Sequence, residues 1–497
     1  MINFEINRLL NFSLKKGLIY EEDKIYSSNM LAGLFKLDNF YFEEVNEALD
    51  TATPILENLL AYAVENNFIA DTTTERDLFD TQIMNCVMPR PSEVIKAFNT
   101  KLKESPECAT DYYYNLAIAS NYVRKDRINK NMTWKTATEY GDLDITINLS
   151  KPEKDPKDIM RARLFKSTSY PKCLLCKENE GFYGNINHPA RQTIRIIPLE
   201  LNKNNFFMQY SPYTYYNEHC IILNSEHIPM KINRTTFGNL LAFIDILPHY
   251  FAGSNADLPI VGGSILSHDH YQGGRYTFAM EKAPIEKAYS IKGYEDVKIG
   301  RVKWPMSVVR ISSTDKNKLI DLAEHILNTW RNYSDEEHDI LSHSENEPHN
   351  TITPIARRRN DEYELDLVLR NNRTSEKYPL GIFHPHNEVH HIKKENIGLI
   401  EVMGLAVLPA RLKTELALIK ENLISNKADI STIEQISKHS DWYKYLLTTY
   451  ENITEENADD ILQREVGIKF LEVLTNAGVY KRDSSGLSAF DKFINIL

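Results

Sequence analysis

The hydrophobic pattern of the chain changes near residue 150, and this change narrows the class of fold. Before it, apolar residues recur close to every 3.6 positions, as over residues 39–67, which we predict to be helical despite Pro54. After it, short runs such as residues 193–197 and 219–223 have the alternating or continuously apolar pattern of strands. Helical patterns return from about residue 411. The chain is therefore predicted to be α+β, with a mixed, largely antiparallel middle between helical ends.

The domain boundaries are predicted from the same change of pattern. Residues 151–158 are charged and proline-punctuated, and we interpret them as a boundary loop. The predicted regions are a mostly helical N-terminal region, two α+β halves and a helical C-terminal region, over residues 1–150, 159–288, 289–425 and 426–497. A length of 497 residues suits this number of domains or subdomains. The two α+β halves are candidates for a duplicated unit.

Charge and cysteine content exclude several classes of protein. The chain has 58 Lys+Arg against 69 Asp+Glu, a net charge of −11, which disfavours binding to nucleic acid or to an anionic membrane surface. Charged residues interrupt the apolar N-terminus, so residues 1–20 are predicted to form an amphipathic helix and not a signal peptide. An odd number of cysteines, five, argues against a disulfide framework and favours the cytoplasm.

A Cys-x-x-Cys motif, Cys173 to Cys176, is the first candidate for chemistry. Two thiolates at this spacing can both reach one Zn²⁺ at about 2.3 Å. Zinc needs four ligands and the chain has no second such motif, so two histidines would have to complete the site. A redox pair and two inert buried cysteines are the alternatives.

The second candidate is the run His-Asp-His-Tyr-Gln over residues 268–272. On a strand, His268, His270 and Gln272 would stand in one row on one face. The preceding Gly262-Gly263-Ser264 could bring backbone N–H groups close to a phosphate. Two satisfied polar histidines beside a turn are the alternative, but three polar side chains in a row between glycine pairs favour a functional site.

HxHxQ with an upstream CxxC resembles the galactose-1-phosphate uridylyltransferases, a family of the histidine-triad superfamily. Residues 209–221, 262–274 and 383–404 are similar to the longer, second class of that family, which is found in bacteria. The clear motifs cover about residues 160–425. The resemblance implies two histidine-triad-like antiparallel halves. It also implies transfer of a uridylyl group from UDP-glucose to galactose 1-phosphate by a ping-pong route through a uridylyl-histidine.

The resemblance also implies a role for each residue of the motifs. It implies His270 as the nucleophile, Gln272 as a hydrogen-bonding partner of the phosphoryl oxygens, Gly263 and Ser264 as the phosphate-contacting turn, and Cys173, Cys176, His227 and His268 as ligands of a structural zinc. His188 and His219 are weaker candidates for the fourth ligand. No organic cofactor is implied, and the partners are the two sugar nucleotides and two sugar phosphates. Homodimers are the habit of the family, although nothing in these residues shows one.

Two departures from the family pattern limit this assignment. The shorter class has HPHGQ where this chain has HDHYQ. That class also has a second metal site, for which a histidine cluster with Glu281 or Glu286 could supply ligands, but the spacing does not match. The cluster is His384, His386, His390 and His391. A polar loop facing the substrate explains the cluster equally well, and residues 393–401 could face the sugar phosphate.

The chemistry agrees with the transferase interpretation. Imidazole is a nucleophile through a neutral nitrogen, is neutral near pH 7, and is also a good leaving group from phosphorus. Sugar 1-phosphates leave without a strong general acid, so a glutamine at position 272 suffices where a hydrolase would more often carry a third histidine. A histidine-triad nucleotide hydrolase, a dinucleoside-polyphosphate phosphorylase and a non-catalytic zinc-stabilised binding protein are the alternatives.

Overall fold

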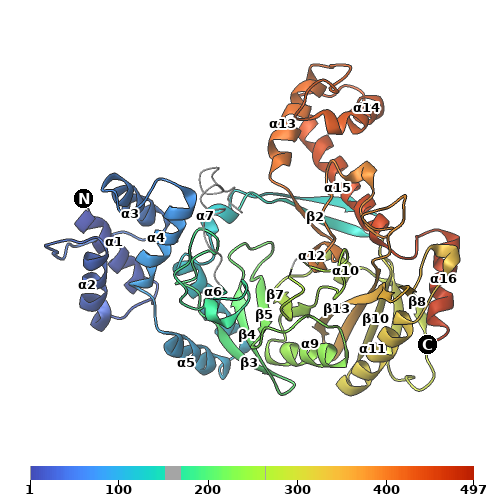
Figure 1. The fold of residues 1–497 in the computed structure, drawn as a ribbon, viewed down its shortest axis with the longest axis horizontal. Helices are drawn as coiled ribbons and strands as arrows, with labels where there is room; N and C mark the ends of the chain where they lie inside the picture. The colour runs from blue at the N-terminus through green and yellow to red at the C-terminus, as the bar shows by residue number, and fades with distance from the viewer. Residues whose placement is uncertain (1, 151–168, 264) are drawn as a thin grey trace.

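The computed structural model describes residues 2–150, 169–263 and 265–497 (Figure 1). The predicted boundary loop over residues 151–158 and Ser264 lie outside the described residues. The described helices are α1 (Ile2–Lys15), α2 (Lys24–Leu34), α3 (Thr53–Glu65), α4 (Thr73–Asn85), α5 (Pro91–Leu102), α6 (Pro106–Ala119), α7 (Lys125–Ile128), α9 (Arg234–Ile246), α10 (Ala279–Lys282), α11 (Lys316–Arg331), α12 (Leu399–Val402), α13 (Arg411–Ile424), α14 (Ser440–Thr449), α15 (Ala458–Ala477) and α16 (Ser484–Ile494). In the part of the chain so described, no helix is both long and apolar enough to cross a bilayer.

A ten-stranded sheet forms the centre of the molecule. Its strands are β3 (Ile197–Leu201), β4 (Asn204–Tyr210), β5 (Cys220–Asn224), β6 (Phe251–Gly253), β7 (His270–Gly274), β8 (Ile285–Tyr289), β9 (Lys298–Val302), β10 (Val308–Ser313), β13 (Asn350–Arg359) and β14 (Glu362–Asn371). The order is β3-β4-β5-β7-β6-β13-β14-β10-β9-β8, and every neighbouring pair is antiparallel. Strands β3 to β7 come from residues 159–288 and β9, β10, β13 and β14 from residues 289–425, while β8 crosses the predicted boundary. The antiparallel sheet with helices on it confirms the α+β class.

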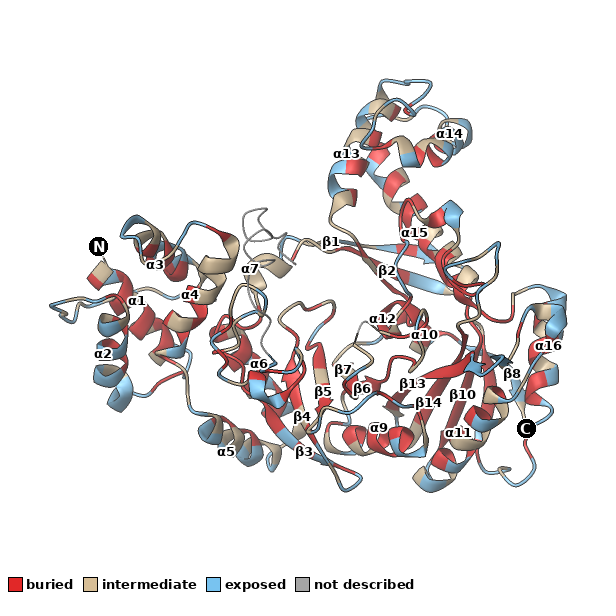
Figure 2. Ribbon diagram, viewed as in Figure 1, coloured by how far each residue is buried: buried red, intermediate tan, exposed pale blue. Residues whose placement is uncertain are grey.

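The two halves join through a short contact. Strands β6 and β13 pair only at Gly253 with Ile355 and at Ala252 with Ala356. Helices α9 and α11 lie along one face of the sheet (Figure 1), and Figure 2 colours most of the strands as buried. Helix α11 begins where the Asp315 side chain accepts two backbone N–H groups. It packs an apolar stripe that includes the fully buried Trp330.

A small second sheet brings a strand from beyond residue 400 against a hairpin from the first 150 residues. It has the order β1-β2-β15, with β1 (Met132–Thr138), β2 (Gly141–Ile147) and β15 (Leu405–Leu408). Strand β15 pairs in parallel with β2. Helix α15 packs on β1, where the Trp134 indole N–H donates to the carbonyl of Gln463. The remaining two-stranded ladder is β11 (His343–Ser344) with β12 (Glu347–Pro348).

Three local predictions were wrong in their bounds. The predicted helix over residues 39–67 is helical only in α3, because Pro54 lies in the first turn and has no N–H to extend the helix backwards. The strand predicted over residues 193–197 begins only at Ile197. The row predicted for residues 268–272 is broken, because the chain bends before β7 and the strand starts at His270.

Candidate active site and metal centre

The four residues implied as metal ligands lie together. One ligand atom from each of Cys173, Cys176, His227 and His268 falls within 4.8 Å of the others. Cys173 Sγ lies 3.5 Å from Cys176 Sγ and 3.3 Å from His268 Nδ1. Cys176 Sγ lies 3.2 Å from His227 Nδ1 and 3.7 Å from His268 Nδ1. In the part of the chain that the structure describes, no other group of histidine, cysteine and acidic side chains has this arrangement.

These distances fit a tetrahedral metal. With arms of about 2.3 Å to sulfur and 2.05 Å to nitrogen, the edges of the tetrahedron are about 3.8 Å for S···S and 3.6 Å for S···N. Burial raises the pKa of the Cys176 thiol to about 11, so a thiolate at this position needs a cation beside it. His268 Nε2 lies 2.9 Å from the carbonyl of Asn224 and donates to it, which leaves Nδ1 free as a ligand. The cluster could therefore hold a metal ion.

His270 is the first residue of β7, a central strand between β5 and β6. Its Nδ1 lies 2.7 Å from the carbonyl of His268 and must donate to it, because a carbonyl can only accept. Nε2 is then the nitrogen with the free lone pair. His270 is only 6% exposed, and burial lowers its pKa to about 4. The side chain is therefore a neutral imidazole of one defined tautomer at physiological pH.

Gln272 follows two residues later on the same strand and is oriented by a second histidine. His219 Nε2 lies 3.0 Å from Gln272 Oε1, so a proton on Nε2 is donated to the amide oxygen. The amide NH₂ of Gln272 is then left for the pocket. The His219 ring is almost completely buried against Tyr215 and Tyr216, and burial lowers its pKa to about 4.

His219 was considered as a possible fourth metal ligand, but the structure places it beside Gln272. It is not part of the metal cluster, and neither is His188, whose Nε2 bonds the Asn179 side chain. The signal that could have located His219 is the antiparallel register of β5 and β7. In this register Ile221 lies opposite Gln272, and His219 stands two residues before Ile221, just ahead of β5. That register is not readable from one sequence.

His270 and Gln272 line a pocket of about 660 Å³. One wall comes from residues 173–176, called the metal loop below, and from Arg191 in the segment that follows it. Another comes from strands β4, β5 and β7. Gly262 and Gly263 also line the pocket, and Gly263 leaves no room for a side chain, since a Cβ there would lie 2.7 Å from the Asn255 amide nitrogen. A further wall comes from residues within 395–401, from the second half of the chain. Asn255 Oδ1 accepts the backbone N–H of Leu399 at 2.9 Å, which ties the two walls together.

The segment over residues 393–401 faces the pocket only in part. Glu395, Asn396 and Glu401 line it. Lys393, in contrast, is buried and donates to Glu401 Oε1 at 2.7 Å. The segment therefore offers the pocket carboxylate and amide groups and keeps its lysine as internal support.

The four histidines considered for a second metal site do not converge on one point. The four rings have separate partners, with His384 on Asn396, His386 on Ile382, His390 on Pro385 and His391 on His439. Glu281 lies beside Arg357, and Glu286 is bound by Arg301 and Arg482. Within residues 2–150, 169–263 and 265–497 these acids and histidines form no group that could hold a metal.

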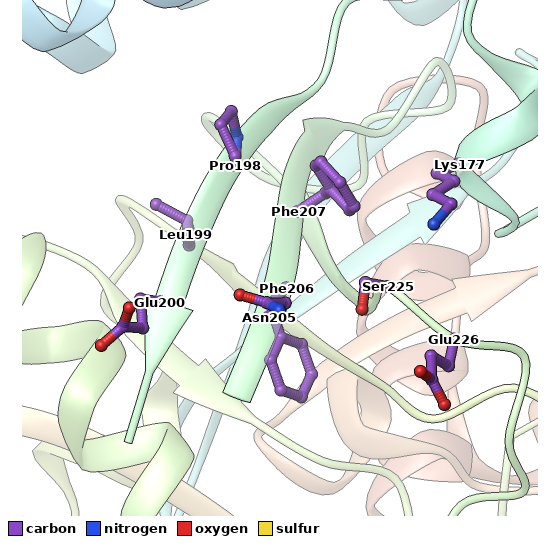
Figure 3. A pocket seen from close by; sticks show the side chains of 9 residues that line it. All are labelled: Lys177, Pro198, Leu199, Glu200, Asn205, Phe206, Phe207, Ser225 and Glu226. Atoms are coloured by element: carbon purple, nitrogen blue, oxygen red, sulfur yellow. The ribbon is translucent and has the colours of Figure 1, made fainter. Parts of the chain in front are cut away.

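A separate hollow of about 560 Å³ lies at the β3 edge of the large sheet (Figure 3). Its side chains come from β3 and β4 and from two loops that contribute Lys177, Ser225 and Glu226. No residue implied for catalysis or metal binding lines it. It therefore has no part in the site described above.

Comparison with known proteins gives a consistent result. The family model for the galactose-1-phosphate uridyl transferase N-terminal domain matches residues 17–229, and the model for the C-terminal domain matches residues 243–443. A galactose-1-phosphate uridylyltransferase of Clostridium acetobutylicum is 80% identical over 497 residues, with all of both chains covered. The enzyme of that name from Caldanaerobacter subterraneus subsp. tengcongensis is 58% identical, with 99% of this chain and 97% of its own covered.

Among solved structures, yeast Ap4A phosphorylase Apa2 is a distant neighbour. Its crystal structure gives a TM-score of 0.35 at 9% identity, covering 67% of this chain and 95% of the phosphorylase. A likeness of that size is too low to carry an inference about fold or chemistry, both of which rest on the sheet order and the site geometry.

Proposed function

Because the chain belongs to the galactose-1-phosphate uridylyltransferase family, we propose that it transfers a uridylyl group from UDP-glucose to galactose 1-phosphate, giving UDP-galactose and glucose 1-phosphate. The observation that carries the mechanism is the hydrogen bond from His270 Nδ1 to the carbonyl of His268. It leaves Nε2 as the attacking nitrogen and gives the cation formed on the ring a fixed acceptor.

The reaction runs in two displacements at one phosphorus. His270 Nε2 attacks the α-phosphorus of UDP-glucose, an N–P bond forms, and the P–O bond to glucose 1-phosphate breaks. Galactose 1-phosphate then attacks the same phosphorus, and the N–P bond breaks. The ring stays protonated at Nδ1 throughout, so no proton has to move at the nucleophile. Gln272, with its amide oxygen held by His219, donates to the phosphoryl oxygens as charge develops there.

The metal is proposed to be zinc with a structural role. Two thiols and two imidazoles at tetrahedral spacing are a ligand set typical of zinc. When bound, zinc would supply folding free energy and not a step of the reaction. Cys173, Cys176, His227 and His268 would hold it. Because His268 also supplies the carbonyl that bonds His270, one of the proposed metal ligands supports the nucleophile directly.

We also propose a cellular location, a role for each region of the chain and an oligomeric state. All five cysteines are free, which suits the reducing cytoplasm. Residues 159–288 would carry the reacting groups, residues 289–425 would complete the sheet and the sugar-facing wall, and residues 1–150 and 426–497 would be helical additions. A homodimer is proposed from family habit.

A labelling experiment tests the function. Protein incubated with UDP-glucose labelled in the uridylyl group should acquire acid-labile label, and galactose 1-phosphate should discharge it as UDP-galactose. If inorganic phosphate discharges the label as well as galactose 1-phosphate does, the phosphorylase alternative replaces the transferase. If no label is acquired and no transfer is detected, a binding protein is the better interpretation.

The pH dependence follows from the burial of His270. Because burial lowers its pKa from 6.5 to about 4, the nucleophile stays neutral well below pH 6.5. We expect kcat/KM for UDP-glucose to change by less than about twofold between pH 8 and pH 6 and to fall only as pH approaches 4. The same shift makes protonation favour the unfolded state, so stability contributed by this residue is present above pH 6.5 and is lost as pH falls towards 4.

Circular dichroism at each pH separates these two effects. An acid limb near pH 6.5 in protein that keeps its fold would contradict the assignment of a buried neutral nucleophile.

Replacement of Gln272 by alanine is expected to slow both half-reactions by about 10²–10³-fold, since one aligned donor to a developing charge is worth about 2.7–4 kcal/mol. Single-turnover rates measured with pre-formed uridylyl-enzyme report the second half-reaction. His219→Phe should slow the same step, and it should add little in the Gln272→Ala background, because His219 is proposed to act through Gln272. Additive losses in the double variant would show that the two side chains act independently.

A further inference from the structure

Arg191 is the one arginine or lysine among the described residues that line the pocket of His270 and Gln272. Its position follows the metal loop in sequence, and no motif in the sequence pointed to it. An arginine remains charged at every physiological pH. The pocket of the proposed nucleophile therefore contains one permanent positive charge in its described lining.

The guanidinium of Arg191 is poorly satisfied by the protein. Nη1 donates to the carbonyl of the neighbouring Ala190 at 3.3 Å, and Nε is buried with no hydrogen-bond partner. Arg191 forms no ion pair with any described carboxylate. Two buried arginines of the large sheet differ in this respect, since Arg310 and Arg357 both bond the carboxylate of Asp366. A half-buried cation without a counter-ion is a feature that a ligand anion would complete.

The backbone of Arg191 is held firmly in place. Its N–H donates to the carbonyl of Phe182 at 2.7 Å, and its carbonyl accepts the N–H of Gly181 at 3.1 Å. This segment is in turn bound to the metal loop. The Asn179 amide donates to the carbonyls of Cys173 and Cys176, at 2.8 and 2.7 Å.

His188 completes this support, because its Nε2 lies 2.7 Å from Asn179 Oδ1. The residues between the metal loop and Arg191 are therefore bound to each other and to the carbonyls of the two cysteines. The backbone of Arg191 is therefore fixed in advance, so only the side chain has to become ordered when a ligand binds.

We propose that Arg191 binds the diphosphate of the nucleotide substrate, with its backbone held at the pocket wall by the segment that is bound to the metal loop. This rests on the proposed function and deepens it, because it names the cationic group that recognises the nucleotide. A guanidinium presents several N–H donors in a planar fork that matches phosphate oxygens. The other side-chain donors in the described lining of the pocket are amides, hydroxyls and imidazoles, and Arg191 is the one lysine or arginine in that lining.

The test compares two probes that differ only in phosphate. Metal-loaded wild type and Arg191→Gln are titrated with UDP and with uridine by calorimetry. UDP affinity is expected to fall about 10- to 100-fold in Arg191→Gln, since the lost bonds are charge-assisted, while uridine affinity should not change. Added salt should weaken UDP binding less in the variant than in the wild type. Arg76→Gln, in helix α4 and paired with Asp71, is the matched control and should bind both probes as the wild type does.

Arg191→Lys tests whether a loss of binding is caused by misfolding. It keeps the positive charge and the aliphatic part of the side chain and loses the planar guanidinium. Its UDP affinity should lie between those of wild type and Arg191→Gln, with normal metal content. Equal loss of UDP and uridine binding, or unchanged UDP binding in a folded Arg191→Gln, would overturn the proposal. If the wild type binds UDP in an Arg191-dependent way and yet transfers no uridylyl group, the proposed function fails while this inference stands. If the wild type transfers normally and Arg191→Gln binds UDP as tightly, this inference alone fails.

Discussion

Replacing His270 by alanine is expected to lower the rate of uridylyl transfer by at least about 10⁴-fold, because no covalent uridylyl-histidine can form without the imidazole. No neighbouring ring can substitute for it. His268 is turned towards the cysteines, and Nε2 of His219 is engaged by Gln272. The variant should also acquire no acid-labile uridylyl label from UDP-glucose.

The fold should survive this substitution, because the strand keeps its backbone pairing with β5 and β6. UDP binding by the variant provides that check. His343→Ala is the matched control, since His343 is exposed on β11 and outside the pocket, and it should keep full activity. Substantial transfer or labelling by a folded His270→Ala protein would remove His270 from the mechanism and direct attention to His268.

Replacing Cys176 by serine is expected to cost at least about 4 kcal/mol of stability, because loss of a structural metal is among the few single changes with so large an effect. Cys176 Sγ is close to all three other ligand atoms, at 3.2 to 3.7 Å, so no smaller site is left when it is removed. Stoichiometric zinc in the wild type, absent from the variant, and a lower thermal midpoint are the expected results. The rate per folded molecule should fall by less than it does in His270→Ala.

The matched control for this prediction is Cys108→Ser, which changes an exposed cysteine at the start of α6. It should keep both the metal and the thermal midpoint. A wild-type protein without stoichiometric metal, or a Cys176→Ser protein as stable as the wild type, would mean that the four side chains are only packed together.

Local patterns in the sequence predicted the elements of the site better than its arrangement. Alternation along β7 correctly paired His270 with Gln272, because both lie on one strand. It failed for His268, because a bend two residues before the strand cannot be distinguished from a strand by residue type alone. The result is chemically sensible, since the bend sends one histidine to the metal cluster and leaves the next at the pocket.

The sequence did not predict Arg191 as part of the site, because a lone arginine is common on any surface and carries no local pattern. Residues 393–401 were considered as a segment that could face the sugar phosphate, but the sequence could not predict the contacts that place them there, such as the one between Asn255 and Leu399. The cluster of Cys173, Cys176, His227 and His268 was the exception, because a CxxC pair with a family motif restricts the remaining candidate ligands to a few histidines.

The pairing of β15 with β2 has a consequence for how the enzyme is made. A ribosome delivers the nucleophile strand β7 long before residues 395–401 and β15, and helix α15, which packs on β1, comes later still. The hairpin of β1 and β2 must therefore wait with an unpaired edge until about 260 further residues have been synthesised. The pocket acquires this wall only after residue 401 has been synthesised, so a shorter chain that still contains every proposed ligand and His270 would lack one wall of the nucleotide pocket.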